Sequence, residues 1–320
     1  MYDLHRLRLL RELKHRGTLA AVAAALSYSP SSVSQQLSQL EAEAGVPLLE
    51  PVGRRVRLTE QAEILVAHTE AVLERLERAE ADIAASLTSL TGTVRVAAFQ
   101  TAALALIPTA LTLLRAAHPG LRPHVTQLEP EAALPALLAR DFDLVVAEEY
   151  PGSPAGGTAG PRNDVLEREE LCVDQLRLAL PEPGPADPYG EAAAADAGGP
   201  RGTLRALAGG RPWAMEPEGT AARPWAMAVC RAAGFEPDVR FESSDLLLHL
   251  RLVEQGHAVA FLPDLVWHAG PPTVALRPLP PGQHARTLFT VVRSGRGRHP
   301  AVAALRRALR QAARPSASAP

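Results

Sequence analysis

The sequence predicts an α/β protein with an all-α-rich winged helix-turn-helix head, a long linker helix and a two-lobed α/β domain. Apolar residues recur at helical spacing up to about residue 45, which predicts the helical head. A heptad pattern then continues from residue 59 to residue 90. Beyond Gly92, short β-rich segments alternate with helical ones, which is typical of an open α/β sheet.

The composition is that of a globular chain of two or three domains. Its 320 residues are 47% hydrophobic, which is enough for sizeable cores. No apolar run approaches the ~20 residues that span a bilayer, and no apolar export segment opens the chain, so we expect a cytoplasmic protein without a membrane partner. The net charge is −2, which excludes a protein that is basic throughout, although cations outnumber anions up to residue 58.

Three helices are predicted in the head, residues 1–58. Leucines at positions 4, 7, 10 and 13 form the stripe of the first helix, and apolar residues at 19, 22, 23 and 26 form that of a short second helix. Ser27 and Tyr28 leave only a brief turn before the third helix, which fits the connection between paired helices. Ser29 suits the N-cap of this third helix, and Pro30 suits its first position.

The third helix has one apolar and one polar face. Its apolar stripe lies at positions 33, 37, 40 and 44, and Gln35 lies opposite that stripe. A helix that offers Gln and Ser without bulky charge can enter a major groove and hydrogen-bond base edges. The alternative is an ordinary packed helix with a polar outer face. The residues expected to contact DNA are Ser29, Ser31, Ser32, Ser34, Gln35, Gln36, Ser38 and Gln39.

After Gly45, two short strands are predicted at 46–49 and 56–58. The turn between them, residues 50–55, is tipped with cations. Arg54, Arg55 and Arg57 could contact phosphates or enter a narrow minor groove. The ordered combination of helix, brief turn, Ser-Pro cap and arginine hairpin favours DNA binding over a merely packed helix.

In this order the residues resemble the LysR-type transcriptional regulators. The matching runs are GTLAAVAAAL at 17–26, SPSSVSQQL at 29–37, LEAEAGVPLL at 40–49 and GRRVRLT at 53–59. The sequence departs from the family at Gln35, where many relatives carry Arg, at Leu49, where Phe is usual, and at Pro51, where Arg is common. These departures bear on base preference and on the wing contacts, not on the fold. The resemblance implies a DNA-binding transcriptional regulator whose partners are double-stranded promoter DNA, a small-molecule effector and RNA polymerase.

Residues 59–90 are predicted to form one linker helix that mediates dimerisation. Its heptad positions run from Leu65 to Ser86, and again from Leu76 to Leu90, four residues further round. A heptad seam needs a partner, so we expect a homodimer joined by paired linker helices, or a tetramer formed through further effector-domain contacts. The alternative is a helix that lies along its own domain.

Residues 91–313 are predicted to form a periplasmic-binding-protein-like effector-binding domain. We expect lobe 1 to comprise about 91–164 and 270–313, lobe 2 about 165–269, loops at 151–161 and 181–202, and a disordered tail at 314–320. Strands are expected at 93–98, 125–128, 142–147, 171–180, 212–215, 239–242, 258–262 and 286–293, and helices at 102–117, 131–140, 221–234, 245–255 and 301–313.

Two such lobes create a cleft where strand ends and helix N-termini meet, which favours a small polar ligand. Thr101 is expected to cap a helix there, and the alternative for each capping residue is capping alone. If Glu148 and Glu149 border the cleft rather than a solvated loop, an amine or other cation, such as an amino acid or a cationic metabolite, fits as the effector. By resemblance to the family, the effector-binding residues are Phe99, Gln100, Thr101, Glu218, Gly219, Thr220, Ser243 and Ser244, and the position of Glu148 and Glu149 after a predicted strand adds these two.

Two other classes of protein share parts of this pattern. A solute-binding protein of a transporter has two lobes, but it needs an export signal and no helical head. An α/β enzyme with an accessory DNA-binding head is the second alternative. The sequence contains no nucleophile elbow, phosphate loop or zinc-like Cys/His spacing, so we expect no catalytic residue, metal or cofactor. We interpret Cys172 and Cys230 as buried small hydrophobes rather than as a peroxide-sensing pair.

Overall fold

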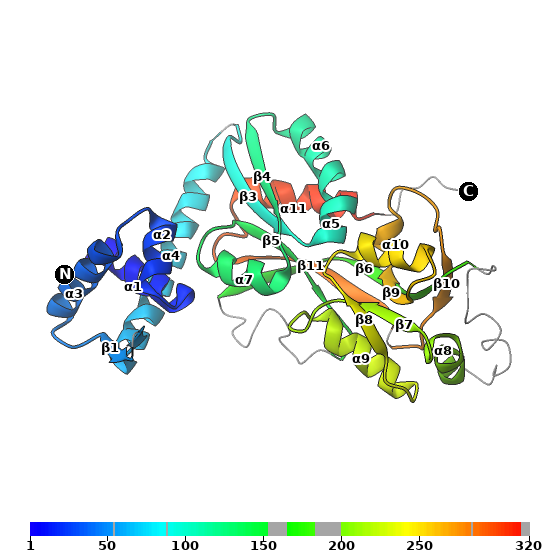
Figure 1. Ribbon diagram of the computed structural model, residues 1–320. Coiled ribbons are helices and arrows are strands. Elements are labelled where there is room, and N and C mark those ends of the chain that lie inside the picture. The colour runs from blue at the N-terminus through cyan, green and yellow to red at the C-terminus, as the bar shows by residue number, and fades with distance from the viewer. Residues whose placement is uncertain (54, 88, 153–164, 183–199, 283, 315–320) are drawn as a thin grey trace.

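The computed structural model describes residues 1–53, 55–87, 89–152, 165–182, 200–282 and 284–314. A helical head, a long helix and two α/β lobes follow one another along the chain (Figure 1), so the expected fold class is confirmed. Within the described residues, no helix combines the length and hydrophobicity needed to cross a bilayer. Most of the two expected loops, and residues 315–320 of the expected tail, lie outside the described part.

The head packs α1 (Leu4–Arg16), α2 (Leu19–Leu26) and α3 (Pro30–Ala44) around one apolar core. Ser29 caps α3, because its Oγ accepts from the backbone N–H of Ser32 at 3.1 Å. The wing is the antiparallel pair β1 (Leu49–Val52) and β2 (Arg55–Leu58). Its first strand begins three residues later than predicted. The Glu41 carboxylate accepts from the backbone N–H groups of Leu48 and Leu49 at 2.8 and 3.0 Å, which ties this segment to α3.

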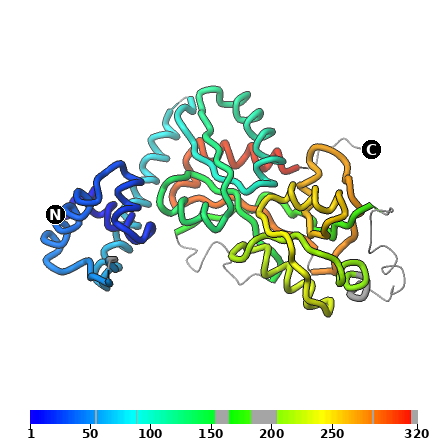
Figure 2. Tube along the Cα trace, viewed as in Figure 1, coloured from blue at the N-terminus to red at the C-terminus, as the bar shows by residue number. Residues whose placement is uncertain are grey.

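Helix α4 (Glu60–Ala85) leads from the head to the first lobe (Figure 2). It has 26 residues and is therefore about 39 Å long, shorter than the expected 59–90. The helix ends at the Ser86 cap, and Leu90 packs against the core of lobe 1 instead of extending the seam. Leu73 is buried against its own chain, whereas Val72, Leu76 and Ile83 of the heptad pattern are exposed.

Lobe 1 is a five-stranded portion of a larger sheet, in the order β4-β3-β5-β11-β6. Strands β3 (Gly92–Ala98), β4 (Leu121–Gln127) and β5 (Leu144–Glu149) are parallel, and β11 (Ala285–Arg293) is antiparallel to β5 and to β6 (Leu166–Leu180). Helix α7 (Pro130–Leu138) packs through Leu134 and Leu137 against one face of this sheet.

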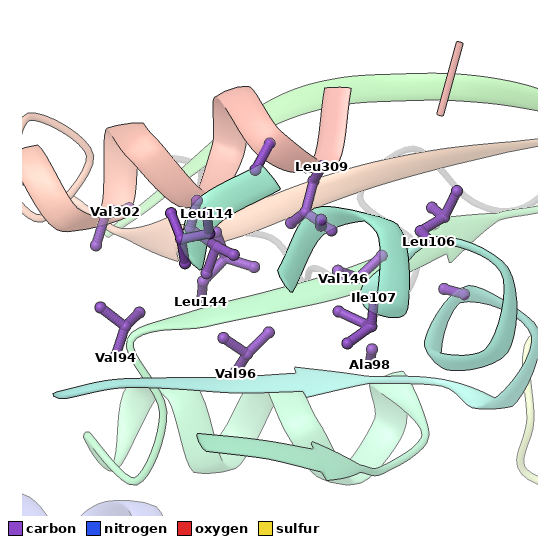
Figure 3. Close-up of a cluster of buried hydrophobic side chains, with 14 of the residues drawn as sticks. Val94, Val96, Ala98, Leu106, Ile107, Leu114, Leu144, Val146, Val302 and Leu309 are labelled. Carbon is purple, nitrogen blue, oxygen red and sulfur yellow. The ribbon is translucent and has the colours of Figure 1, made fainter. Parts of the chain in front are cut away.

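The other face of lobe 1 is covered by α5 (Gln100–Ala105), α6 (Ile107–Ala117) and α11 (Pro300–Ala312). Figure 3 shows the resulting core, in which side chains of β3 and β5 point towards Leu114 and Leu309. The helix predicted at 102–117 is therefore two helices that meet at Leu106. Pro108 lacks an N–H group, so it cannot continue the hydrogen bonding of the preceding turn.

Lobe 2 is built on the second half of β6. Residues 176–179 of that strand pair with β9 (Ala260–Pro263) on one side, and residues 177–180 pair with β10 (Ala275–Pro278) on the other. A parallel pair, β7 (Pro212–Met215) and β8 (Asp238–Glu242), continues the lobe through an isolated bridge between β7 and Val259. Helices α8 (Pro200–Ala208), α9 (Ala222–Ala232) and α10 (Leu246–Glu254) and the short helix η2 (Asp264–Trp267) complete it.

Strand β6 crosses from one lobe to the other. Its residues 166–175 pair with β11, in lobe 1, although we expected lobe 2 to begin near residue 165. Strand β10 was not predicted. It pairs in lobe 2, although we expected the residues from 270 onwards to belong to lobe 1. An apolar alternation reveals a strand but not its neighbours, so this change of partners leaves no signal in the sequence.

Candidate functional site

The outer face of α3 carries the polar side chains expected from the sequence. Val33, Leu37 and Leu40 are buried in the head, which turns the opposite face outwards. Gln36 accepts from Arg6 Nε at 3.0 Å, which places a cation of α1 beside this face that the sequence did not indicate. Ser32 and Gln36 are half-buried, and the exposed positions are Ser29, Ser31, Ser34, Gln35, Ser38 and Gln39.

Arg57 is the wing arginine whose side chain the structure describes. The side chain of Arg57 is 72% exposed and forms an ion pair of 2.6 Å with Glu50 on the facing strand. Arg54 and the side chain of Arg55 lie outside the described part of the chain. An exposed pair of this kind is weak and can exchange for a phosphate contact.

Between the lobes, Arg286 of β11 is a hub that the sequence analysis missed. It is 1% exposed, and its guanidinium donates to Asp174 at 2.8 and 3.0 Å and to the Glu148 carboxylate. It also donates to Thr101 Oγ1 at 2.7 Å and to the Tyr150 hydroxyl at 3.3 Å. Two carboxylates thus balance the buried guanidinium. The sequence does not single Arg286 out, because the predicted strand 286–293 carries an arginine at each end.

The expected glutamate pair divides between two faces of β5. Glu148 is buried against Arg286, whereas Glu149 is half-buried and pairs with Arg168 of β6. Successive side chains of a strand point to opposite faces, so the two glutamates cannot face one ligand together. Only Glu148 belongs to the Arg286 cluster.

The first helix of lobe 1 places Gln100 and Thr101 differently from the prediction. The N-cap of α5 is Phe99 and not Thr101, whose hydroxyl is instead held by Arg286. Phe99 and Thr101 are both 2% exposed. Gln100 reaches across to lobe 2, where it accepts from the backbone N–H of Leu246 at 2.7 Å and donates to Asp245.

The residues expected from lobe 2 lie mainly in turns. Glu218 and Gly219 are exposed, and the Thr220 hydroxyl donates to the carbonyl of Pro217 at 3.0 Å. Ser243 accepts from the backbone N–H of Asp245 at 3.0 Å, and Ser244 is exposed. Asp245, not either serine, caps α10. The structure therefore assigns these side chains turn and capping contacts.

Three further glutamates, which sequence reasoning missed, surround the Arg286 cluster. Burial, followed by the charges of Glu148 and Glu131, raises the pKa of Glu129 to about 7. Burial, followed by the charge of Glu148, raises the pKa of Glu216 well above its usual range. A signal existed, because a Glu-Pro-Glu segment, 129–131 and 216–218, follows a strand in each lobe.

The two cysteines lie in different hydrophobic cores, Cys172 beside that of lobe 1 and Cys230 within that of lobe 2. Burial, followed by the charge of Asp174, raises the pKa of Cys172 to about 11. Burial also raises the pKa of Cys230 to about 12. Both thiols are therefore protonated near neutral pH and are poor nucleophiles.

Two family profiles match nearly the whole chain. Residues 4–63 match "Bacterial regulatory helix-turn-helix protein, lysR family", and residues 87–314 match "LysR substrate binding domain". A curated relative from Mycobacterium avium, a "Probable hydrogen peroxide-inducible genes activator", is 30% identical over 81% of this chain and 76% of its own length.

Two solved structures share the fold over most of their length. A point variant of full-length OxyR from Pseudomonas aeruginosa has a TM-score of 0.66 at 20% identity, covering 97% of this chain and 95% of that one. Full-length CbnR in complex with its target DNA has a TM-score of 0.51 at 20% identity, covering 97% of this chain and 100% of that one.

Proposed function

This chain belongs to the LysR family of bacterial regulators, and we propose that α3 reads promoter DNA while the cleft between the lobes senses a small molecule. It is a DNA-binding transcriptional regulator with an effector-binding domain. The observation that carries the proposal is the exposed, uncharged Ser and Gln face of α3. We propose residues 1–58 as the DNA-binding unit, 59–90 as the linker and 91–313 as the sensor.

For DNA contact, we propose that Gln35 reads a base edge and that Arg57 contacts phosphate. Gln35 is exposed opposite the buried stripe of α3, and a side-chain amide can pair with adenine in the major groove. Arg57 lies on the exposed wing, where Glu50 holds it until a phosphate replaces that partner.

Gln35→Ala is expected to change sequence preference at one base position of each half-site by about 5- to 150-fold, the value of one good base contact. Arg57→Ala is expected to weaken binding to all sequences alike and to reduce the salt slope by about one. Selection of bound genomic fragments, including the gene's own upstream region, followed by salt titration, measures both. Gln311→Ala, the same change on an exposed position of α11, serves as the control. An unchanged preference in Gln35→Ala would refute the assigned face.

We propose a homodimer joined through α4. Val72, Leu76 and Ile83 are 45%, 44% and 66% exposed, although they repeat at heptad spacing. A second copy of the helix would cover this stripe and bring two reading helices to neighbouring half-sites.

Side-chain hydrogen bonds join the head and the linker to lobe 1 of the sensor, and we propose that these bonds carry the effector signal. Glu77 of α4 is 4% exposed and receives Arg293 Nε of β11 at 2.8 Å and a second bond from Arg140. Arg16 of α1 bonds Asp141 of lobe 1 at 2.7 Å. A ligand that prefers one lobe arrangement would shift the position of the head through these bonds, and with it the access of RNA polymerase.

We propose that the chain is not an enzyme and that its thiols do not sense peroxide, although the Mycobacterium avium relative carries a peroxide-inducible name. Peroxide is expected to leave DNA binding unchanged, because the raised pKa values of Cys172 and Cys230 keep both thiols protonated. The Cys172→Ala/Cys230→Ala double variant should behave like the unmodified protein in the same DNA-retention assay. A peroxide-dependent shift that disappears in this double variant would contradict the prediction.

A further inference from the structure

A small cavity lies in lobe 2, beside the carboxylates of the cleft. Tyr150, Trp225, Phe261 and Glu216 are among the residues that line it. The Trp225 ring centroid is 5.2 Å from that of Tyr150 and 5.2 Å from that of Phe261. The space that a water-sized group can occupy there is about 20 Å³, which is room for about one such group. An ammonium group has this size, and aromatic rings beside a carboxylate are surroundings that it prefers.

Among the described residues, the surroundings of this cavity hold more acidic than basic side chains. Arg286 bonds directly to Glu148 and Asp174, which already offset its charge. Glu129 and Glu216 add two further carboxylates whose pKa is raised chiefly by burial and then by the charge of Glu148. Within the described part of the chain, this cluster thus has more carboxyl groups than cations.

Two neighbouring side chains do not supply the missing charge. His249 also lines the cavity, but burial lowers its pKa, so it is neutral near pH 7. Arg223 donates to the backbone carbonyl of Glu216 at 2.9 Å and to the exposed Glu242 at 3.1 Å. The Arg223 guanidinium is therefore engaged by these two acceptors.

Trp225 can offer its ring, but not its N–H group, to a cation. Its side chain is buried, with 7% exposure, and its indole N–H has no hydrogen-bond partner among the described residues. An ammonium group has no acceptor for this donor, so the indole contributes through the face of its ring. The hydroxyl of Tyr150 is already bonded to Glu148 and Arg286.

The carboxylates are spread over both lobes rather than gathered around one point. In the described part of the chain, no group of three or more His, Cys, Asp or Glu side chains is arranged to hold a metal ion. Glu131 of α7 is engaged with the backbone N–H of Ala221 at 2.8 Å, across the cleft from lobe 1 to lobe 2. An extended organic cation fits this distribution better than a single ion does.

We propose that the effector is a small aliphatic amine cation whose ammonium head enters the cavity between Glu216 and the rings of Tyr150, Trp225 and Phe261. This inference rests on the proposed function, in which the cleft holds the effector. The rest of the molecule extends from the cavity towards Glu129 and Glu131, so a second amino group finds a second carboxylate. Closure of the lobes over the cation would then add new contacts to the hydrogen bonds that Gln100 and Glu131 of lobe 1 already form with lobe 2.

Binding of a cation should release protons from the cleft. Glu129, with its pKa of about 7, faces Glu131 of its own helix, Glu148 of β5, Glu216 of lobe 2, Arg286 of β11 and the backbone N–H of Gln100. An alkylamine stays protonated near neutral pH, because its pKa is about 10.4 like that of lysine. The amine therefore prefers the ionised glutamate, and its affinity is expected to rise about tenfold from about pH 6 to about pH 8. Glu129→Gln should flatten this dependence.

Titration calorimetry with four matched probes tests the proposal: butylamine, 1,4-diaminobutane, 1-butanol and butanoate. We expect both amines to bind, the diamine more tightly, with proton release that shows as a dependence of heat on the buffer. Glu216→Gln is expected to weaken amine binding about 10- to 100-fold, the value of a hydrogen bond to a charged group. Trp225→Phe keeps an aromatic ring and removes the N–H group, so it is expected to bind the amines nearly as well as the unmodified protein does. Glu236→Gln removes one exposed carboxylate of lobe 2 and serves as the control.

Binding of butanoate or butanol as tight as that of the amines would overturn the proposal, and so would the absence of amine binding to the intact protein. Unchanged amine affinity in Glu216→Gln would also overturn it. DNA retention is measured on the same preparations. If DNA is retained but the amines fail, only the effector class is wrong. If the amines bind but no DNA is retained, the proposed function fails instead.

Discussion

Replacing Arg286 with alanine is expected to lower the free energy of unfolding by about 3–5 kcal/mol. The guanidinium is 1% exposed and joins β11, β5, β6 and α5 through Glu148, Asp174 and Thr101. Its removal leaves two buried carboxylates without their cation, and each must be desolvated or protonated. The variant is expected to be most stable at pH values low enough to protonate Glu148 and Asp174.

Chemical denaturation at two pH values checks this prediction. Burial raises the pKa of Asp174 and of Glu148 even beside Arg286, and loss of Arg286 raises both pKa values further. A raised carboxyl pKa gives stability at low pH that is lost as the pH rises through it. The deficit should therefore be smaller near pH 5 than near pH 8. Arg277→Ala, on an exposed position of β10, serves as the control, and an equal loss in both variants would contradict the prediction.

Arg11→Ala is expected to detach the head from lobe 1. Arg11 of α1 is 0% exposed and donates to Glu70 of α4 at 2.8 Å, to Glu12 at 2.9 Å and to the backbone carbonyl of Leu138. Each hydrogen bond to a charged group contributes about 1.5–3 kcal/mol, so we expect the contact to weaken by at least tenfold. The head itself should stay folded, because Arg16 still pairs with Glu12.

Hydrogen exchange of the free protein measures this detachment without any effector. Amides of α1 and of residues 138–141 should exchange faster in Arg11→Ala, while those in the core of lobe 1 should not change. Arg8→Ala replaces an exposed arginine on the same helix and is expected to leave the exchange unaltered. Unchanged protection in Arg11→Ala would show that Arg11 does not hold the two parts together.

Local patterns predicted the head well. Ser29 at the cap, Pro30 at the first position and the stripe of Val33, Leu37 and Leu40 define α3, because capping and apolar spacing are local properties. The exposed positions of its outer face followed from the same geometry.

The cleft was predicted only in part, because its chemistry depends on contacts distant in sequence. Arg286 meets Thr101 across 185 residues and Asp174 across 112 residues, which no local pattern reveals. Glu149 was grouped with Glu148 because the two are adjacent, although the alternation of a strand separates them. Thr101 was expected at a cap, but the helix begins two residues earlier than predicted, at Gln100, and the Thr101 hydroxyl accepts from Arg286.

The passage of β6 through both lobes governs how they can move. A continuous strand resists stretching but tolerates changes in twist, so the lobes can swivel about it more readily than they can part. Lobe 1 holds the linker through the bond between Arg293 and Glu77. A swivel at the middle of β6 would thus move lobe 1 and α4 together relative to lobe 2. Because α4 is a rod of about 39 Å, its far end would move furthest.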